Sequence, residues 1–255
     1  MTTPGPEIAV DTLLCIDIGN SRLKARCWSH GPEGDALSLE GGDVDALLDA
    51  LAPLLAAAEG RVGLCSVRPS LGLPLARALR ARGAQLREIR GDSPAPFPVA
   101  VAQRETLGAD RLCNAAAAWA ASLAPALVID AGTAVTVDLV DAGGVYRGGA
   151  ILPGQSLTLR ALGAGAEQLF EARPDWPPSP WGRDSAEALA AGALWGGLAA
   201  LEGLALRYRA DWGDAAPVIL TGGAAPGLAE RWAAGACRLE PDWTLRGVAA
   251  LCASH

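Results

Sequence analysis

Residues 13–20 read Leu-Leu-Cys-Ile-Asp-Ile-Gly-Asn, an apolar run that ends in an aspartate, a glycine and a small amide side chain. Residues 126–133 read Ala-Leu-Val-Ile-Asp-Ala-Gly-Thr, which is the same pattern displaced by 113 residues, from Asp17 to Asp130. In both places polar and apolar residues then alternate, as in a strand that returns beside the first one. The chain is therefore expected to be internally duplicated, with a strand, a tight turn and a returning strand opening each half.

The rest of the chain alternates between helical and strand-like segments. Apolar spacing predicts helices over residues 44–58, 73–82, 112–123 and about 185–208, and a helix is expected near Gly247. Short apolar runs predict further strands over residues 61–67 and 218–221, and proline-rich connectors occupy residues 91–98 and 174–181. This alternation is typical of an α/β protein.

The composition excludes several classes of function. The 255 residues are 51% hydrophobic and carry 21 basic against 28 acidic side chains, a formal net charge of -7. A chain of this length has room for one large domain or two smaller ones. The acidic balance repels polyanions, so no nucleic-acid partner is expected. Lys24 is the only lysine, so phosphate groups would have to be bound by local donors and metal ions.

Cysteine and histidine usage indicates a cytoplasmic protein that relies on carboxylates. The six cysteines form no C-x-x-C pair and are expected to be buried thiols in a reducing compartment. The first residues lack the basic and apolar regions of a signal peptide. The uncharged run at 112–129 contains Asn114, Ser122 and Pro125, so we expect a buried helix and a strand there and no membrane partner. Only two histidines are present, which leaves acid–base chemistry to aspartate and glutamate.

The two repeated loops suit phosphate binding. A glycine after a strand-terminal aspartate lets backbone N–H groups approach phosphate oxygens, and the carboxylate can orient a hydrated cation. A single Asp-x-Gly is most often an ordinary hairpin turn. Two copies at matching places, with Thr221-Gly222-Gly223 further on and Lys24 near the first copy, favour a nucleotide site.

This three-part pattern resembles the phosphate 1, phosphate 2 and adenosine motifs of the actin, hexokinase and heat-shock ATPase superfamily. The resemblance implies an α/β fold of two duplicated ribonuclease-H-like domains with an interdomain nucleotide cleft. The domains would span residues 8–112 and 113–255. The phosphate loops would be Asp17–Lys24 and Asp130–Thr136, with Gly222 and Gly223 against the adenosine.

Three further motifs narrow the resemblance to one family. They are Leu-Gly-Ala-Asp-Arg at 107–111, Gly-Gly-Ala-Ile-Leu-Pro-Gly at 148–154 and Gly-Arg-Asp-Ser at 182–185. With the two aspartate loops, in this order and spacing, they resemble type III pantothenate kinase, also called the Bvg accessory factor family, over about residues 13 to 250. The resemblance implies ATP-dependent phosphorylation of pantothenate to 4′-phosphopantothenate, the first step of coenzyme A biosynthesis.

The resemblance also assigns roles to residues. Asp110 would be the proton acceptor, and Asp130 would hold a monovalent cation, K⁺ or NH₄⁺. ATP would be bound by Asp17, Ile18, Gly19, Asn20, Ser21, Arg22, Leu23, Lys24 and Thr133. The substrate would be bound by Val101, Gly108, Ala109, Asp110, Arg111 and Ser185. Mg²⁺ would accompany ATP, and the protein would be a homodimer.

The residues themselves agree with a catalytic carboxylate but leave an alternative open. Phosphoryl transfer needs a carboxylate that orients or deprotonates the attacking hydroxyl group. Asp110 is placed for this just before the alanine-rich helix, and Arg111 could pair with a substrate carboxylate. The structural alternative is that Asp110 caps that helix and pairs with Arg111.

Three departures from the family pattern lie on the acceptor side. Val101 stands where the family usually has tyrosine, Arg104 where it has proline, and Asp184-Ser185 where it has Asn-Thr. They leave open a kinase of the same fold that acts on another small hydroxyl compound. A third alternative is a nucleotide-binding transcriptional accessory factor with little turnover. The acidic net charge and the presence of Asp17, Asp110 and Asp130 argue against this last reading.

Overall fold

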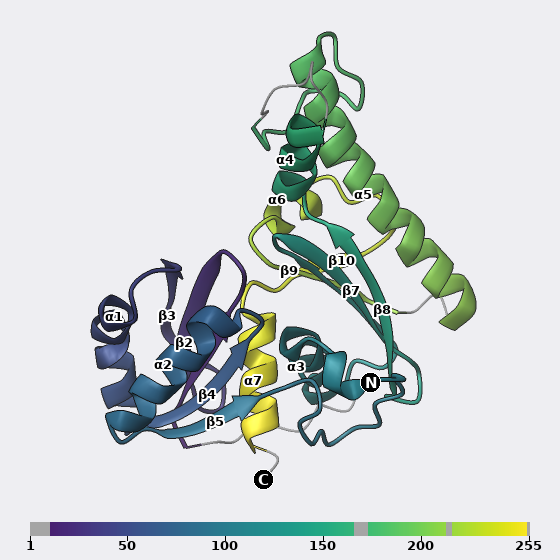
Figure 1. Cartoon of the computed structure of the whole chain (residues 1–255). Coiled ribbons are helices and arrows are strands. Elements are labelled where there is room, and N and C mark those ends of the chain that lie inside the picture. Colours follow the sequence, from purple (N-terminus) through teal and green to yellow (C-terminus); the bar gives the residue numbers. More distant parts are fainter. Residues whose placement is uncertain (1–10, 166–172, 213–215, 254–255) are drawn as a thin grey trace. The chain divides into compact units, whose positions relative to one another are not determined.

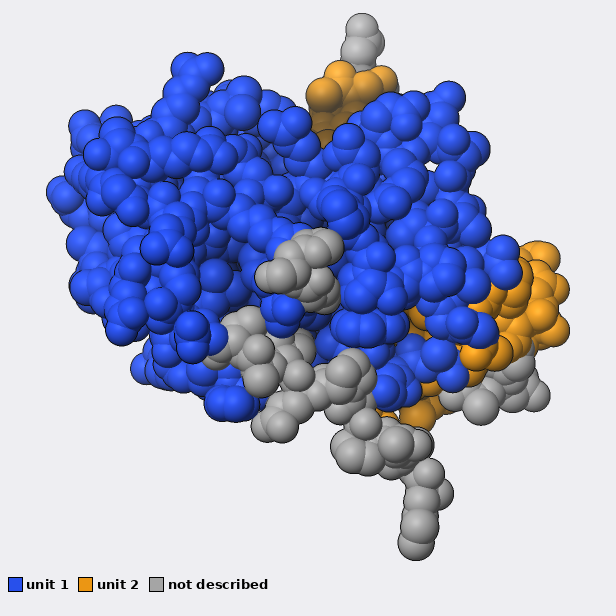
Figure 2. Space-filling view, turned by 90° about the horizontal axis from the view of Figure 1, so that it is seen from below, with its two compact units in different colours: residues 1–124, 143–148, 242–255 blue, residues 125–142, 149–241 orange. Residues whose placement is uncertain are grey.

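The computed structural model describes residues 11–165, 173–212 and 216–253. Residues 1–10, where the sequence predicts no signal peptide, lie outside the described residues. The contacts divide the chain into two compact units, each with its own five-stranded sheet; Figure 1 draws the strands, and Figure 2 colours the two units separately. Unit 1 comprises residues 1–124, 143–148 and 242–255, and unit 2 comprises residues 125–142 and 149–241.

The sheet of unit 1 has the strand order β3-β2-β1-β4-β5. The strands are β1 (Leu13–Ile18), β2 (Arg22–Trp28), β3 (Pro32–Glu40), β4 (Arg61–Ser66) and β5 (Gln85–Ile89). The first three pair antiparallel, whereas β4 runs parallel to β1 and β5 parallel to β4. The helices are α1 (Val44–Ala57), α2 (Pro69–Ala81), α3 (Ala109–Ala120) and α7 (Trp243–Ala253), with a short 3-10 helix at Arg104–Thr106.

The side chains of β1 alternate between the two faces of the sheet. Leu14, Ile16 and Ile18 are fully buried in the core that the sheet shares with α1 and α2. Because successive side chains of a strand point to opposite faces, Cys15 and Asp17 point the other way. That second face packs against α7 and α3.

A close contact between α3 and α7 covers this second face. A Cβ atom on Gly247 of α7 would overlap the backbone carbonyl of Cys113 in α3. Two hydrogen bonds reinforce the contact: Trp243 Nε1 donates to the Asn114 carbonyl oxygen at 3.1 Å, and Thr244 Oγ1 donates to Asn114 Oδ1 at 3.1 Å. The contact therefore holds α3 at a defined position against the sheet of unit 1.

The sheet of unit 2 has the strand order β10-β9-β6-β7-β8. The strands are β6 (Ala126–Ala131), β7 (Ala134–Val140), β8 (Tyr146–Pro153, in unit 2 from Gly149 on), β9 (Val218–Thr221) and β10 (Cys237–Leu239). The helices are α4 (Gln155–Gly165), α5 (Ser185–Trp212) and α6 (Ala225–Ala229). One face of the sheet carries Leu127, Ile129 and Val137 into a core with Leu198 and Leu201 of α5.

The two sheets confirm the predicted duplication. The orders β3-β2-β1-β4-β5 and β8-β7-β6-β9-β10 are the same connectivity, because in each unit a hairpin opens the sheet and the next strand pairs parallel to its first strand. The compact units place α3 and α7 together with the first sheet, so they group residues differently from the division at 112/113. That domain division stays a prediction.

Two local expectations change in the structure. Helix α3 begins at Ala109, with Gly108 as its N-cap residue, so Asp110 lies inside the first turn and not before the helix. An aspartate is favourable there because the first turn carries partial positive charge. All six cysteines are free thiols, but Cys237 and Cys252 are only partly buried, whereas the sequence predicts six buried thiols.

Among the described residues, α5 is the one helix long and apolar enough to cross a membrane by length and composition. Leu198 and Leu201 of this helix pack on the sheet of unit 2. A core helix passes the same test, so composition alone is weak support for a membrane span.

The α3–α7 contact yields a stability prediction. Gly247→Ala should lower the free energy of unfolding by about 1–3 kcal/mol, because the added methyl group overpacks against the Cys113 carbonyl. The matched control is Gly203→Ala in α5, where a Cβ atom meets nothing within 4 Å. That change should raise stability by up to about 1 kcal/mol through helix propensity. Urea unfolding curves of both variants check this, and a stabilised Gly247→Ala variant would contradict the close approach.

Candidate active site

The first phosphate loop is a tight turn between β1 and β2. The Gly19 N–H donates to the Arg22 carbonyl oxygen at 2.9 Å, and the turn residues Asn20 and Ser21 are exposed. The side chains of Ile18 and Leu23, which the resemblance places among the ATP-binding residues, are fully buried in the core. These two residues can contact a nucleotide only through their backbone groups.

Lys24 lies directly across the hairpin from Asp17. The two residues are partners in the antiparallel register of β1 and β2, and both side chains point to the face opposite Leu23 and Ala25, which belong to the core. Cross-strand partners have Cβ atoms about 4.5–5.5 Å apart. A carboxylate and an ammonium group therefore share the start of this loop.

The carboxylate of Asp110 is held by a backbone hydrogen bond in the first turn of α3. Its Oδ1 accepts a hydrogen bond from the Arg111 N–H at 2.8 Å. A Cβ atom on Gly108 would overlap this oxygen, so the glycine makes room for the carboxylate. Because the N-cap is Gly108, without a side-chain hydrogen bond, Asp110 does not act as the N-cap residue.

Asp17 and Asp110 converge on one pair of buried thiols. Cys65 of β4 is the parallel register partner of Asp17, and Cys113 lies about one turn after Asp110 on α3. The Cys113 hydrogen bond and burial raise the pKa of Cys65, and burial raises the pKa of Cys113. The charges of Asp17 and Asp110 raise the pKa of both thiols further. Unit 1 thus places two carboxylates near one pair of thiols, Asp17 at the end of β1 and Asp110 in the first turn of α3.

The environment of Asp110 makes it a stronger base than an ordinary aspartate. Burial raises its pKa above the usual 3.8, and the neighbouring Arg111 offsets part of this effect. A raised pKa strengthens a carboxylate as proton acceptor.

The second phosphate loop, in unit 2, is a turn between β6 and β7 that is hydrogen-bonded to the segment at 148–154. The Gly132 N–H donates to the Ala134 carbonyl oxygen at 3.1 Å. The Gly154 N–H donates to the Thr133 carbonyl oxygen at 3.0 Å, which ties the Gly-Gly-Ala-Ile-Leu-Pro-Gly segment to this loop. Thr133 itself is partly buried in the turn between β6 and β7.

Gly222 brings the third motif against Asp130. It has a φ of +90°, and a Cβ atom there would lie 2.5 Å from Asp130 Oδ1 and 2.6 Å from the Ala131 carbonyl oxygen. The Ala224 N–H donates to that same carbonyl at 3.0 Å. The Asp130 loop and the glycine turn are therefore in direct contact within unit 2.

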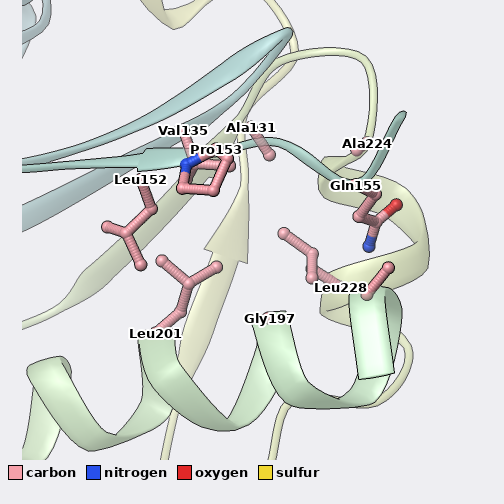
Figure 3. Close-up of a pocket in the computed structure, with 10 residues that line it drawn as sticks. Ala131, Val135, Leu152, Pro153, Gln155, Gly197, Leu201, Ala224 and Leu228 are labelled. Carbon is pink, nitrogen blue, oxygen red and sulfur yellow. The ribbon is translucent and has the colours of Figure 1, made fainter. Parts of the chain in front are cut away.

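An apolar pocket lies behind this second loop (Figure 3). Ala131 and Ala224 line it from the loop side, and Leu201 of α5 and Leu228 of α6 line it from the core side. It encloses about 360 Å³ of empty space, part of it open to solvent. Its lining has no charged side chain, so it does not suit a phosphate group.

Two of the residues that depart from the family pattern, Arg104 and Asp184, form hydrogen bonds within the structure. Arg104 Nη2 donates to the Ser93 carbonyl oxygen at 2.6 Å and so ties two loops of unit 1 together. Asp184 caps α5, because its Oδ1 accepts the Glu187 N–H at 2.8 Å. Ser185 is the first residue of that helix. Sequence reasoning missed both roles, although Asp-x-x-Glu before an apolar helix is a recognisable capping signal.

Val101 lies beside β8 in unit 1. The neighbouring Ala100 N–H donates to the Tyr146 carbonyl oxygen at 2.8 Å. A Cβ atom on Gly148 would lie 3.4 Å from Val101 Cγ1, and Tyr146 is fully buried. The buried Tyr146 side chain therefore does not replace the tyrosine expected at position 101.

Comparison with solved structures shows the fold. A protein from Campylobacter jejuni described as a Baf family transcriptional activator superposes with a TM-score of 0.60 at 20% identity, covering 92% of this chain and 94% of that one. An inorganic polyphosphate/ATP-glucomannokinase from Arthrobacter sp. strain KM gives a TM-score of 0.51 at 15% identity, covering 96% and 100%. Both share the two-sheet architecture.

Curated relatives match the sequence directly. A type III pantothenate kinase from Thermomicrobium roseum is 40% identical over 54% of this chain and 53% of the relative, and one from Paramagnetospirillum magneticum is 43% identical over 56% and 55%. The chain thus spans about half the length of these curated relatives. A type III pantothenate kinase from Rhodopirellula baltica is 34% identical over 82% of this chain and 86% of the relative.

The sequence model of the type III pantothenate kinase family matches residues 13–207. With this match and the long alignment to the Rhodopirellula relative, the chain belongs to the type III pantothenate kinase family.

Proposed function

We propose that this protein transfers the γ-phosphoryl group of ATP to pantothenate, forming 4′-phosphopantothenate in the first step of coenzyme A biosynthesis. The proposal is carried by two placements around one pair of hydrogen-bonded thiols: Asp17 is the register partner of Cys65, and Asp110 lies one turn before Cys113 on α3. Burial raises the pKa of Asp110. Membership of the family supplies the substrate. The same membership supports a metabolic enzyme in the cytoplasm.

The residues of unit 1 provide what phosphoryl transfer needs, namely positioning, charge neutralisation and a base. Asp110 accepts the proton of the attacking hydroxyl group. Backbone N–H groups of the exposed turn residues Asn20 and Ser21 face the phosphates, and Lys24 balances their charge. Arg111 orients the acceptor by pairing with its carboxylate.

The oxygen atoms around Asp130 fit a hard cation. Its carboxylate lies beside the Ala131 carbonyl oxygen, and Thr136 is its register partner across the hairpin. K⁺ and Mg²⁺ prefer oxygen ligands of this kind. Among the described residues no group of three or more His, Cys, Asp or Glu side chains could hold a metal, so ATP oxygens and water would complete the coordination. When bound, these ions neutralise the phosphate charge.

A homodimer is part of the proposal. Several large apolar side chains of unit 2 are exposed, with Ile151 at 64% and Trp181 at 73% exposed. Burial of such side chains between two copies would remove apolar surface from water.

The second candidate function is a kinase of another small hydroxyl compound. Val101 favours it, because its aliphatic side chain beside Gly148 offers no hydroxyl group to a polar acceptor. A nucleotide-binding regulator with little turnover is the remaining alternative, and it predicts ATP binding without acceptor-dependent ADP release.

An acceptor panel separates these functions. ADP release from ATP should require pantothenate, with other small alcohols, sugars and hydroxy acids giving much lower kcat/KM. The measurement is coupled detection of ADP with Mg²⁺ and K⁺ present. A different preferred acceptor would favour the second kinase, and ADP release that no acceptor stimulates would favour the regulator.

Asp110→Asn tests the proposed base. Turnover should fall about 10²–10⁴-fold with little change in ATP affinity, since asparagine keeps the size of the side chain but cannot accept the proton. Steady-state ADP release and ATP titration measure the two effects. Wild-type turnover should also fall as pH decreases through the raised pKa of Asp110.

The stability of the same variant separates catalysis from structure. Below the unfolded pKa of the carboxyl group both states are protonated, and as pH rises through the raised folded pKa the folded state must ionise a buried group. The ionised carboxylate therefore costs stability at neutral pH. Asp110→Asn should be at least as stable as the wild type at pH 7, and a large loss in melting temperature would point to a structural role.

Asp17→Asn and Asp130→Asn test the two loops. Each should abolish most turnover while the protein stays folded, because each removes a charge that orients the ATP-bound cations. Asp130→Asn should in addition remove the stimulation of the wild-type enzyme by potassium, measured against sodium at equal ionic strength. Near-normal rates in either folded variant would show that its loop is only a hairpin turn.

A further inference from the structure

The two duplicated hairpins differ in the residues that face their aspartates, and this difference carries an inference that rests on the proposed function. In unit 1 the register partner of Asp17 is Lys24. In unit 2 the register partner of Asp130 is Thr136. Two residues further along the returning strands stand Arg26 and Asp138.

The hairpin of unit 1 therefore places two basic residues on the face of its aspartate. Lys24 and Arg26 point to the same face as Asp17, because Leu23, Ala25 and Cys27 take the core side of β2. Arg26 forms an ion pair with Asp242. Lys24 is thus the basic residue directly across the hairpin from Asp17.

The hairpin of unit 2 has the opposite character. Asp130, Thr136 and Asp138 share the face opposite Val135, Val137 and Leu139, which belong to the core. Thr136 Oγ1 donates a hydrogen bond to Asp138 Oδ2 at 3.1 Å. Thr136 is 8% exposed and Asp138 is fully buried. A buried carboxylate thus stands where the other hairpin has an arginine.

A buried carboxylate is costly unless hydrogen bonds and charges compensate it. The Asp138 carboxylate accepts a hydrogen bond from a neighbouring hydroxyl group, and this fixes the orientation of that hydroxyl. A hydroxyl group has one proton and two lone pairs, and the proton of Thr136 is directed to Asp138. The two lone pairs of Thr136 Oγ1 then point away from Asp138. Asp130 is the cross-strand neighbour there, with Cβ atoms about 4.5–5.5 Å apart in such pairs.

We propose that Asp138 is a positioning residue for the cation side of the active site. By accepting the hydrogen bond from Thr136, Asp138 holds the hydroxyl group with its lone pairs toward Asp130. Thr136 Oγ1 thereby becomes an oxygen ligand for the monovalent cation beside the Asp130 carboxylate. In many metal sites a hydrogen-bonded carboxylate behind the ligand fixes the orientation of the side chain that binds the metal. Asp138 has the same relation to the Thr136 hydroxyl group.

A double-mutant cycle on Thr136 and Asp138 tests the inference. Thr136→Val and Asp138→Asn should each raise the potassium concentration for half-maximal ADP release by about 10-fold or more, the usual effect of losing such a partner. Because Asp138 acts through Thr136, adding Asp138→Asn to Thr136→Val should have no further effect on the potassium requirement. Thr136→Ser should retain the wild-type potassium requirement.

A second readout does not depend on turnover. The melting temperature of the nucleotide-free protein is measured in potassium chloride and in tetramethylammonium chloride at equal ionic strength. The wild type and Thr136→Ser should be stabilised by potassium, and Thr136→Val and Asp138→Asn should lose most of that stabilisation. If ADP release does not depend on pantothenate, the proposed function fails, while this shift still reports the cation site.

The matched control is Thr244→Val in α7. It removes a buried threonine hydroxyl that donates to Asn114 Oδ1 at the same 3.1 Å, and Thr244 is 6% exposed. It should lower the melting temperature without changing the potassium dependence. An unchanged potassium requirement in Thr136→Val or in folded Asp138→Asn, additive effects in the double variant, or no potassium stabilisation of the wild type would each overturn the proposal. Thr136→Val is close to isosteric, so it remains decisive if Asp138→Asn does not fold.

Discussion

The close approach of α7 to α3 is the contact on which the geometry of unit 1 depends. Gly247 lets the two helices meet at the Cys113 carbonyl, and Asn114 of α3 receives hydrogen bonds from Trp243 and Thr244. The contact sets α3 against the second face of the sheet, where Asp17 points. Asp110 lies in the first turn of α3, one turn before Cys113. A contact between the end of the chain and its middle thereby places two carboxylates that are far apart in sequence near the same pair of thiols, Cys65 and Cys113.

The duplication explains why the two loops share a shape and not a chemistry. Both hairpins begin with a buried strand, an aspartate and a glycine, and both sheets have the same connectivity. The returning strands then diverge, with Lys24 opposite Asp17 and Thr136 opposite Asp130. A lysine is a cation itself, whereas a hydroxyl group beside two carboxylates is a set of oxygen atoms. One backbone pattern thus carries two chemically different sets of side chains beside its aspartates.

The predictable elements were those with a strong local pattern. The strands at Leu13–Ile18 and Ala126–Ala131 each open with four apolar residues before their aspartate, and α1 has clear helical spacing. β3 was missed because its residues are mostly exposed and include Gly34, so it has little apolar alternation. β10 and α6 are only three and five residues long, too short for a periodic pattern. Helix α2 begins at Pro69, four residues before the predicted start, because proline suits the first turn of a helix.

The sequence by itself determined the paired aspartate loops, the α/β duplication and the family, because these follow from local runs of residues and their spacing. It also singled out Asp110. Only the tertiary structure decided that Asp17 and Asp110 lie near the same pair of thiols, Cys65 and Cys113. It also decided that the side chains of Ile18 and Leu23 point into the core and that Asp138 is buried beside Thr136. The physical reason is that strand register and helix packing join residues distant in the chain. Burial and pKa depend on those neighbours and not on the adjoining sequence.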